Sequence, residues 1–335
     1  MRAVVVAGPR RLAVEEVPDP RPEPGQVVLR VAACGICGSD LHVHQAGFLP
    51  AGSIMGHEFA GEVVEGAGGL RTGERVCALP TLSCGRCERC REGLGVYCKT
   101  QRALGLGQAP GAYAEYVAVA AHEVVRLPGG VDAERGALVE PLAVGLHAVA
   151  VARVRPGETC LVIGAGPIGI AIALWARHLG AREVIVSERA PGRRALAERL
   201  GATRVVDPER EELAAVLAGI APDGADVVFE AVGARGLIQE CVDRVRFRGR
   251  VVVAGVCITP DTIQPGLAVL KEASVHFVLA YERRDFERTV ELLERRELDP
   301  TALITDRIGL AAVPAAFDAL ERPSAQGKVL VLPGS

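Results

Sequence analysis

Short hydrophobic runs interrupted by proline and glycine fill the first third of the chain. Runs rich in valine predict strands, because β-branched side chains suit a pleated backbone, and the interruptions predict turns. The expected strands are Val4–Val6, Leu12–Val17, Val27–Val31, Phe59–Val64, one through Val76 and Cys77, and Ala112–Val119. This pattern predicts a small antiparallel β domain.

Strands and helices alternate from residue 159 onward, which predicts a different architecture. The expected strands are Thr159–Ile163, Val184–Val186, Arg204–Val206, Asp226–Glu230, Gly249–Val256 and Val275–Leu279. Helices are expected from the glycine-rich loop to about Leu179, over Glu209–Gly219 and over Leu237–Val245. Regular βα alternation favours a doubly wound parallel sheet of the Rossmann type, here with six strands, so the fold class is α/β.

The segments on either side of this sheet predict how the domains divide. Before it, Val131–Leu138 and Leu142–Val151 are expected to be helical, and Glu140 extended, because proline disfavours a helical conformation in the residue before it. After it, the chain predicts a helix, a strand, a helix and a final strand at Phe286–Arg295, Ile304–Ile308, Ala311–Leu320 and Lys328–Leu332. The parallel sheet is then complete, so this tail is expected to rejoin the first domain. The predicted domains are 1–142 with 281–335, and 143–280.

Composition narrows the class of partner. The chain has 335 residues, 49% of them hydrophobic, and a net charge of −3 with both signs interspersed. Nothing in this balance favours nucleic acid, and no apolar run reaches the roughly 18 residues that a membrane span needs. The N-terminal apolar run is too short for a secretory signal, so we expect a cytoplasmic protein acting on a small molecule. In that reducing compartment, the ten cysteines favour metal sites over disulfides.

The strongest metal pattern is the spacing C-x2-C-x2-C-x7-C formed by Cys84, Cys87, Cys90 and Cys98. Four thiolates at short spacing suit a closed tetrahedral zinc site that folds a loop and does no chemistry. The alternative is four unrelated cysteines in one loop, but free thiols rarely lie this densely without a metal or a disulfide.

A second group of metal-binding residue types precedes this lobe. Its segments are Cys37-Gly38-Ser39-Asp40-Leu41-His42 and Gly56-His57-Glu58. Cysteine and histidine are the usual zinc ligands, a carboxylate can complete the set, and Ser39 and His42 would place proton-transfer groups beside the metal. The alternative is that Cys37 and His57 simply pack in a core. Cys34 completes a C-x-x-C pair with Cys37, but no thioredoxin-like βαβ surrounds it, so we expect it to pack.

A glycine-rich loop follows the first strand of the parallel sheet. It comprises Gly164, Ala165, Gly166, Pro167, Ile168 and Gly169. In such a loop the first glycine makes the turn, the second lets the backbone approach a pyrophosphate at the helix N-terminus, and the third permits close helix–strand packing. Glu188, 24 residues after Gly164, stands where an acid binds the ribose hydroxyls and favours NAD over NADP. Other candidate cofactor contacts are Arg193, Gly255 and Val256, although Arg193, with Arg189 and Arg194, keeps NADP open.

These motifs together resemble the zinc-dependent medium-chain dehydrogenases, and most closely the sorbitol, threonine and butanediol dehydrogenase branch. The matching segments are Cys37–His42, Gly56–Glu58, the four-cysteine lobe at about 80–100, Glu140-Pro141-Leu142 and Gly164–Gly169. The resemblance implies a GroES-like catalytic domain joined to a Rossmann domain, with the nicotinamide held in the cleft between them. The chain differs from sorbitol dehydrogenases in having Val43 after His42 and Ala280 before Tyr281. It differs from threonine dehydrogenases in lacking a histidine just before the four-cysteine lobe.

The resemblance also implies roles for individual residues. Cys37, His57 and Glu140 would bind a catalytic zinc, with Glu58 as an alternating ligand or a group behind the ligands and Asp40 orienting His57. The lobe would hold a structural zinc. Substrate contacts are expected near Phe48, Leu106 and Tyr281, and the partner is expected to be a second copy paired through Val275–Leu279, as a homodimer or homotetramer.

The function that follows is reversible NAD-linked hydride transfer between a secondary alcohol, vicinal diol or polyol and its ketone. Zinc would act as a Lewis acid, Ser39 would take the hydroxyl proton, and His42 would pass it outward. Three alternatives stay open: a threonine 3-dehydrogenase-like oxidation of an amino alcohol, a zinc-free quinone reductase of the same fold, and a zinc-ribbon binding module fused to a nucleotide sensor.

Overall fold

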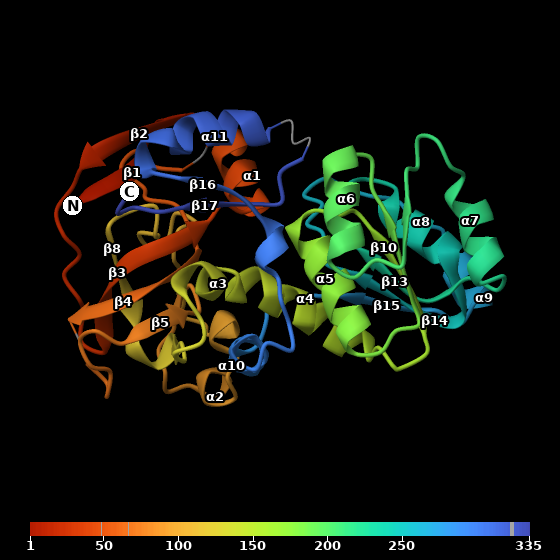
Figure 1. Ribbon diagram of the computed structural model, residues 1–335, viewed down its shortest axis with the longest axis horizontal. Coiled ribbons are helices and arrows are strands. Elements are labelled where there is room, and N and C mark those ends of the chain that lie inside the picture. The colour runs from red at the N-terminus through yellow and green to blue at the C-terminus, as the bar shows by residue number, and fades with distance from the viewer. Residues whose placement is uncertain (48, 66, 322–324) are drawn as a thin grey trace. The chain divides into compact units, whose positions relative to one another are not determined.

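The computed structural model describes residues 1–47, 49–65, 67–321 and 325–335, without the side chain of Glu65. The chain divides into two compact units (Figure 1). The first comprises Met1–Ala143, Tyr281–Pro323 and Lys328–Ser335, and the second comprises Val144–Ala280 and Ser324–Gly327. Among the described residues, no helix combines the length and apolar character that crossing a bilayer demands.

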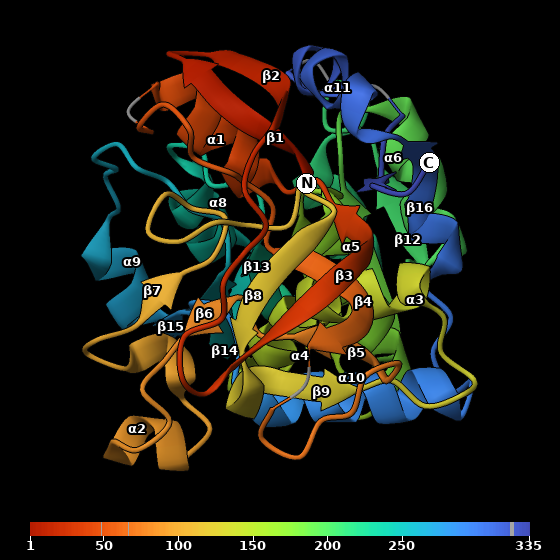
Figure 2. The same cartoon turned by 90° about the vertical axis from the view of Figure 1, so that its left-hand side faces the viewer.

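The first unit is built mainly on antiparallel strands. They are β1 (Arg2–Gly8), β2 (Arg11–Glu16), β3 (Gln26–Gly35), β4 (Glu58–Glu65), β5 (Arg75–Ala78), β6 (Thr81–Leu82), β7 (Arg102–Ala103), β8 (Tyr116–Ala120), β9 (Val124–Arg126), β16 (Ile304–Ile308) and β17 (Lys328–Val331). Seven of them form one sheet in the order β16-β17-β3-β4-β5-β9, with β8 also paired to β3. Figure 2 shows β8, β3 and β4 of this sheet side by side. The C-terminal strand β17 therefore lies beside β3 in this sheet.

Helices connect the strands of the first unit. They are α1 (Gly38–Ala46), α2 (Glu88–Arg91), α3 (Ala133–Ala137), α10 (Arg283–Glu294) and α11 (Val313–Leu320), and α4 (Val139–Ala152) begins here and continues into the second unit. Single 3₁₀ turns lie at Gly95–Tyr97, Ala121–Glu123, Thr301–Leu303 and Leu310–Ala312.

Alternation along β3 shows why the first unit folds around this sheet. After a buried start at Val27 and Val28, Leu29 and Val31 are buried whereas Arg30 and Ala32 are exposed, as the period of two along a strand requires. Leu29 and Val31 join a core that also contains Phe59 of β4 and Phe317 of α11. Burial of each such side chain is worth roughly 1.5–3 kcal/mol, so the sheet and α11 stabilise each other.

The second unit contains the predicted parallel sheet of six strands, in the order β12-β11-β10-β13-β14-β15. Its strands are β10 (Thr159–Ile163), β11 (Glu183–Ser187), β12 (Arg204–Val206), β13 (Ala225–Glu230), β14 (Val245–Val253) and β15 (Ser274–Phe277). Its helices are α5 (Pro167–His178), α6 (Pro191–Arg199), α7 (Leu213–Ile220), α8 (Leu237–Arg244) and α9 (Pro265–Leu270). Helices α5 and α6 lie on one side of the strands and α7, α8 and α9 on the other (Figure 1), so the sheet is doubly wound.

Several predicted boundaries were wrong, each for a local reason. Strand β8 begins at Tyr116 and not at Ala112, because the amides of Ala112 and Tyr113 donate to the carbonyls of Gly56 and Met55 instead of to a neighbouring strand. Helix α7 begins at Leu213, where the carboxylate of Glu212 caps it by accepting from the Ala215 amide. Strand β14 ends at Val253, because the next amides turn back to the Glu230 carbonyl.

The extended conformation predicted for Glu140 was also wrong. Glu140 is the second residue of helix α4, and Pro141 is the third. A proline in the first turn of a helix loses nothing, since the amides of that turn have no partner within the helix. The short helix α3 ends at Ala137 and α4 begins at Val139, so the chain turns almost directly from one helix into the next.

Candidate active site

The segment after β3 forms helix α1, for which the sequence analysis predicted no helix. Cys37 is its N-cap residue, with extended backbone angles of φ −102° and ψ 154°. The Asp40 carboxylate accepts the Cys37 amide at 3.0 Å, which closes the first turn. The helix therefore fixes the Cys37 thiol at its N-terminal end and carries Asp40 inward.

A tight turn places His57 opposite this thiol. Gly56 has a φ of +96°, which favours glycine, and a Cβ atom there would lie 2.7 Å from the Tyr113 ring. The turn buries both His57 and Glu58. The Cys37 sulfur, a His57 ring nitrogen and a Glu58 oxygen all lie within 4.8 Å of one another.

Asp40 stands behind His57 and is completely buried. Its Oδ1 atom lies 3.2 Å from His57 Nδ1. Burial would raise the pKa of Asp40, but the charge of His57, with hydrogen bonds from Tyr113 and the Cys37 amide, lowers it below its usual value. Burial would likewise lower the pKa of His57, but Asp40 and Cys37 raise it well above its usual value. The remaining nitrogen, Nε2, lies 3.3 Å from Ser39 Oγ.

Glu58 forms a buried ion pair that the sequence analysis missed. Lys328 Nζ of β17 lies 2.7 Å from each carboxylate oxygen of Glu58 and also donates to the Ile36 carbonyl at 3.1 Å. Both side chains are almost fully buried. The available signal was a single lysine inside the apolar run Lys328–Leu332, but its partner lies 270 residues away.

Glu140 is buried in the first turn of α4, and burial raises its pKa to about 7. Tyr281 is also buried, and burial together with the charge of Glu140 raises the pKa of its hydroxyl well above its usual value. Glu140 is not part of the group of mutually close donor atoms, which consists of Cys37, His57 and Glu58 among the described residues. His57 and Glu58 nevertheless act on the pKa of Glu140 electrostatically, His57 lowering it and Glu58 raising it.

The other candidates near this cluster differ in exposure. His42 is exposed on α1, and Cys34 is buried in the core as expected. Leu106 is half-buried. Phe48 lies outside the described residues.

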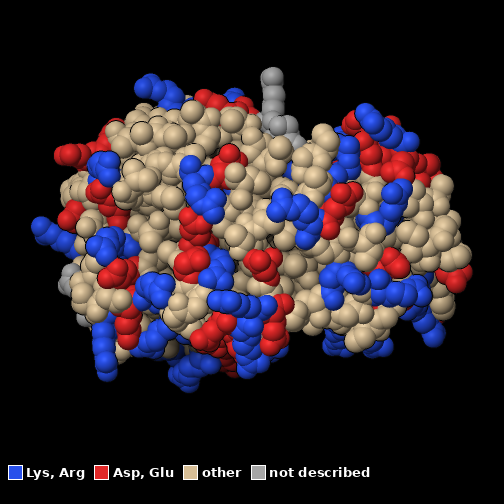
Figure 3. Space-filling view, viewed as in Figure 1, with Lys and Arg blue, Asp and Glu red and all other residues tan. Residues whose placement is uncertain are grey.

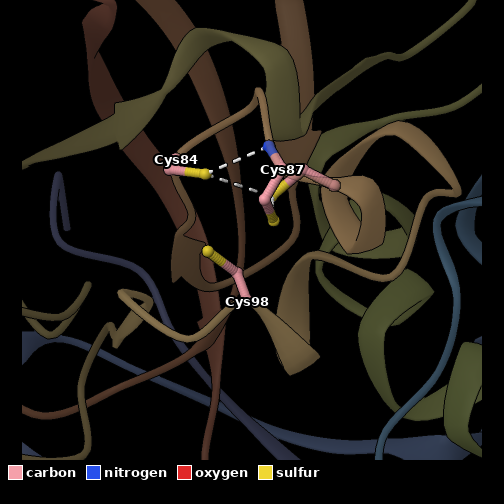
Figure 4. Close-up of side chains that lie close together, drawn as sticks. Cys84, Cys87 and Cys98 are labelled. Carbon is pink, nitrogen blue, oxygen red and sulfur yellow. Dashed lines mark hydrogen bonds between the residues drawn. The ribbon is translucent and has the colours of Figure 1, made fainter.

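The four cysteines of the lobe come together as their spacing predicts. Their sulfur atoms all lie within 4.8 Å of one another, and Figure 4 shows those of Cys84, Cys87 and Cys98 pointing toward one another. The Cys87 amide donates to Cys84 Sγ at 3.4 Å. Hydrogen bonds from Thr100 lower the pKa of Cys98 to about 6, and burial raises that of Cys90 to about 11.

The glycine-rich loop has the geometry that its glycines predict. Gly164 has a φ of +97°, and a Cβ atom on Gly169 would clash with the Gly164 carbonyl, so helix and strand approach closely there. A Cβ atom on Gly166 would meet no atom within 4 Å, which leaves the backbone open on that side. Gly166 is also the N-cap of α5, and Pro167 and Ile168 begin the helix.

Glu188, just after β11, is tied to this loop. Its Oε2 accepts the Ala165 amide at 2.8 Å, and its Oε1 accepts the Ala190 amide at 2.8 Å. Arg193 Nε donates to the Gln326 carbonyl. Arg194 pairs with Asp207 at 2.9 Å.

The turn after β14 is organised by a second residue that the sequence analysis missed. Glu230 is buried at the end of β13 and accepts the amides of Val232 and Gly233, each at 2.8 Å. Gly255 packs against the Gly233 amide and the Glu230 carboxylate, where a side chain would not fit. Val256, the next residue, is 63% exposed.

Both donor sets fit a zinc ion. Four sulfur atoms at mutual short distance suit a closed tetrahedral site. A thiol, an imidazole and a carboxylate suit a site with a position left for substrate, and the carboxylate on the far ring nitrogen is the partner that a metal-bound histidine usually has. The open backbone at Gly166 fits a bound pyrophosphate.

Two family models match the chain. The one described as an alcohol dehydrogenase GroES-like domain matches residues 23–129, and the one described as a zinc-binding dehydrogenase matches residues 167–295. An L-threonine 3-dehydrogenase of Mesorhizobium japonicum is 34% identical over 95% of this chain and 94% of its own length. Among solved structures, the 2R,3R-butanediol dehydrogenase of Bacillus subtilis is 31% identical, covers 99% of both chains and has a TM-score of 0.90. A Sinorhizobium meliloti protein bound to NADP is 33% identical, with 99% of both chains covered and a TM-score of 0.90.

Proposed function

The chain belongs to the zinc-dependent medium-chain dehydrogenases, an NAD(P)-dependent family of oxidoreductases, and we propose that it transfers hydride reversibly between a secondary alcohol or vicinal diol and the matching ketone. The observation that carries this proposal is the close group of a partly buried Cys37 with the buried His57 and Glu58. In the proposal, residues 1–142 and 281–335 form the catalytic domain, and residues 143–280 bind the cofactor.

The catalytic zinc would be held by Cys37, His57 and Glu140, with Glu58 as an alternating ligand. When bound, it supplies Lewis-acid chemistry that lowers the pKa of a substrate hydroxyl towards neutrality. Lys328 donates to Oε1 of Glu58, whereas Oε2 has no hydrogen-bond partner among the described residues, so Glu58 keeps an oxygen that could serve as a ligand. The four-cysteine lobe would hold a second, structural zinc.

Ser39 is the group placed to receive the substrate proton. Its Oγ atom is 3.3 Å from His57 Nε2, so it lies beside the proposed ligand. His42 follows three residues later on α1, on the same face of the helix, and is exposed, so it can pass the proton to water. A nicotinamide cofactor held at the glycine-rich loop would supply the acceptor for the hydride that the substrate carbon gives up.

The same proposal favours NAD over NADP. The Glu188 carboxylate is held at the glycine-rich loop by two amide donors, where its charge would repel a 2′-phosphate. Arg193 donates to the Gln326 carbonyl and Arg194 pairs with Asp207, whereas Arg189 is exposed and lies 3.9 Å from Glu209. The Sinorhizobium meliloti relative bound NADP, so both cofactors belong in the assay.

The substrate class rests on the relatives. One is named a threonine dehydrogenase and another a butanediol dehydrogenase. Threonine and butanediol both carry a secondary hydroxyl beside a second polar carbon. A vicinal diol is therefore the first candidate, and a threonine-like amino alcohol is the second.

We also propose that the chain pairs with a second copy through β15. This strand is at the edge of the parallel sheet, where its backbone can pair with another strand. Phe277 and Leu279, at its end, are 72% and 59% exposed, and Leu270 in the preceding helix is 78% exposed. These features support a homodimer or homotetramer.

The alternative of a zinc-ribbon module for nucleic acid loses its main support. The matched GroES-like region, residues 23–129, includes the lobe, so the four cysteines belong to a dehydrogenase domain. Acidic and basic side chains are mixed over the face seen in Figure 3. The ten free thiols support our proposal that the protein works in the cytoplasm.

Zinc content and cofactor reduction test the proposed function together. The variant is Cys37→Ala, and Cys34→Ala is the matched control three residues earlier. The panel contains secondary alcohols, vicinal diols, polyols and threonine, each with NAD and with NADP. We expect two zinc ions in the wild type and in Cys34→Ala, one in Cys37→Ala, and an activity loss of about 1000-fold only in Cys37→Ala. Retention of both zinc ions with intact activity in Cys37→Ala would contradict the proposal.

A further inference from the structure

Tyr113 connects the two segments that carry the proposed ligands Cys37 and His57. We propose that Tyr113 is a positioning residue, whose hydroxyl holds Asp40 in the orientation that aligns His57 for the metal. This inference rests on the proposed role of His57 as a ligand. It adds a residue outside both matching motifs, which the sequence analysis did not select.

The hydroxyl contact is short and excluded from water. Tyr113 Oη lies 2.6 Å from Asp40 Oδ2 and 3.2 Å from the Gly35 carbonyl oxygen. A phenol has one proton to donate, and the shorter contact with a carboxylate identifies Asp40 as the acceptor. Tyr113 and Asp40 are both completely buried, so bulk solvent does not reach either partner.

The Asp40 carboxylate is fixed by groups on three different segments. Its Oδ2 accepts from Tyr113 and from the Cys37 amide, and its Oδ1 faces His57 Nδ1 at 3.2 Å. Two donors on one oxygen hold the plane of the carboxylate and therefore the direction in which Oδ1 points. Removal of the phenol leaves Oδ2 with the Cys37 amide as its remaining donor. The carboxylate can then rotate, so that Oδ1 turns away from His57.

The backbone and ring of Tyr113 contact the two residues that precede His57. Its amide donates to the Met55 carbonyl at 2.9 Å. Its ring fills the space beside Gly56, where a Cβ atom would come within 2.7 Å of it. One residue therefore supports His57 through the backbone turn and, by way of Asp40, through the imidazole ring.

A purely structural role is the competing explanation. The Tyr113 ring also meets Phe317 edge-on, at 6.0 Å between centroids, within the core. Tyr113→Phe keeps the ring and its packing and removes only the hydroxyl. Any effect that runs through Asp40 must then disappear when Asp40 has already been changed.

The experiment compares zinc release from the full-length, zinc-loaded protein in five variants. These are Tyr113→Phe, Asp40→Asn, the double variant, Cys37→Ala and, as a matched control on β8, Tyr116→Phe. Zinc transfer to a chromophoric chelator is followed in time, and the visible absorption of the cobalt-substituted protein reports ligand geometry. Loss of a direct partner of a metal-bound histidine costs about 10–100-fold in affinity. We expect about tenfold faster release in Tyr113→Phe, with an altered cobalt spectrum, and release in the double variant no faster than in Asp40→Asn alone.

Two results would overturn the inference while leaving the proposed function in place. One is release from Tyr113→Phe at the wild-type or Tyr116→Phe rate with an unchanged cobalt spectrum. The other is an additive effect in the double variant, which would mean that Tyr113 acts by packing and not through Asp40. Full retention of both zinc ions in Cys37→Ala would instead remove the ligand assignment on which the inference depends.

Discussion

The two cysteine-containing clusters of the first unit are assembled in opposite ways. All four sulfur atoms of the lobe come from residues 84–98, which include only the single-turn helix α2 and a 3₁₀ turn. The second cluster consists of Cys37, His57 and Glu58 and is called the buried cluster below. Cys37 lies at the start of α1, His57 and Glu58 lie at the start of β4, and the neighbouring Lys328 lies on β17. One is a local structure, and the other exists only because the sheet has formed.

This difference indicates what a metal contributes to each cluster. Lobe side chains are held by a few contacts within the loop, such as the Cys87 amide on Cys84, so a metal would supply most of the order there. The buried residues are already held by Asp40, Tyr113 and Lys328. A metal entering that cluster would find Cys37 and His57 already in place, which is the preorganisation that catalysis needs.

Breaking the buried ion pair is expected to have the largest effect on stability. Lys328→Met leaves Glu58 as an uncompensated buried charge, which costs about 3–5 kcal/mol of unfolding free energy. Because the penalty arises from the stranded charge, Lys328→Met with Glu58→Gln should recover a large part of it. Thermal unfolding of wild type, both single variants and the double variant measures this. Equal losses in Lys328→Met and in the double variant would show that packing, and not the ion pair, stabilises this region.

Removing a lobe cysteine is expected to have an intermediate and local effect. In Cys98→Ser, amide exchange within residues 84–98 should rise about thirtyfold, or roughly 2 kcal/mol in local opening free energy, because the metal holds this loop together. Exchange in β4, which borders the buried cluster, should stay unchanged. Hydrogen exchange followed by mass spectrometry reports both segments in one sample. Faster exchange in β4 would mean that the two clusters are not independent.

The smallest effect on stability is expected at an ion pair outside both clusters. It serves as a reference for the effects expected at the Lys328–Glu58 pair and at the lobe. In the second unit, Asp226 accepts the Thr159 amide and pairs with Arg246 at 2.6 Å. Burial would raise the pKa of Asp226, but the Thr159 amide and Arg246 lower it below its usual value. A lowered folded-state pKa stabilises the protein above the unfolded pKa of about 4, and this contribution is lost as pH falls through the folded value.

Asp226→Asn should therefore cost about 1 kcal/mol near pH 7, since the pair is partly exposed, and progressively less below pH 4. Chemical denaturation at several pH values measures the difference. Asp223→Asn, on a neighbouring exposed turn, is the control. A cost that stays constant down to the lowest pH would exclude a charge-dependent contribution.

The pattern of the chain predicted local structure well. Strands β10 and β12 have the predicted bounds, and the six-stranded parallel sheet is present. These elements are well predicted because period, length and glycine punctuation act within a few residues. Helix α1 was missed, since its sequence has almost no amphipathic pattern and its first turn is closed by Asp40 reaching back to Cys37.

By itself, the sequence determined what depends on near neighbours: the glycine-rich loop, the clustering of the lobe cysteines and the alternation of strands and helices. Only the tertiary structure decided what joins distant segments. Lys328 meets Glu58 and Tyr113 meets Asp40 because β17 and the segment before β8 are brought beside β3 and α1, across 270 and 73 residues of chain. Such pairs leave no periodic trace in the sequence, since each partner alone looks like an ordinary lysine, tyrosine or acid, and only burial without water turns the contact into a requirement.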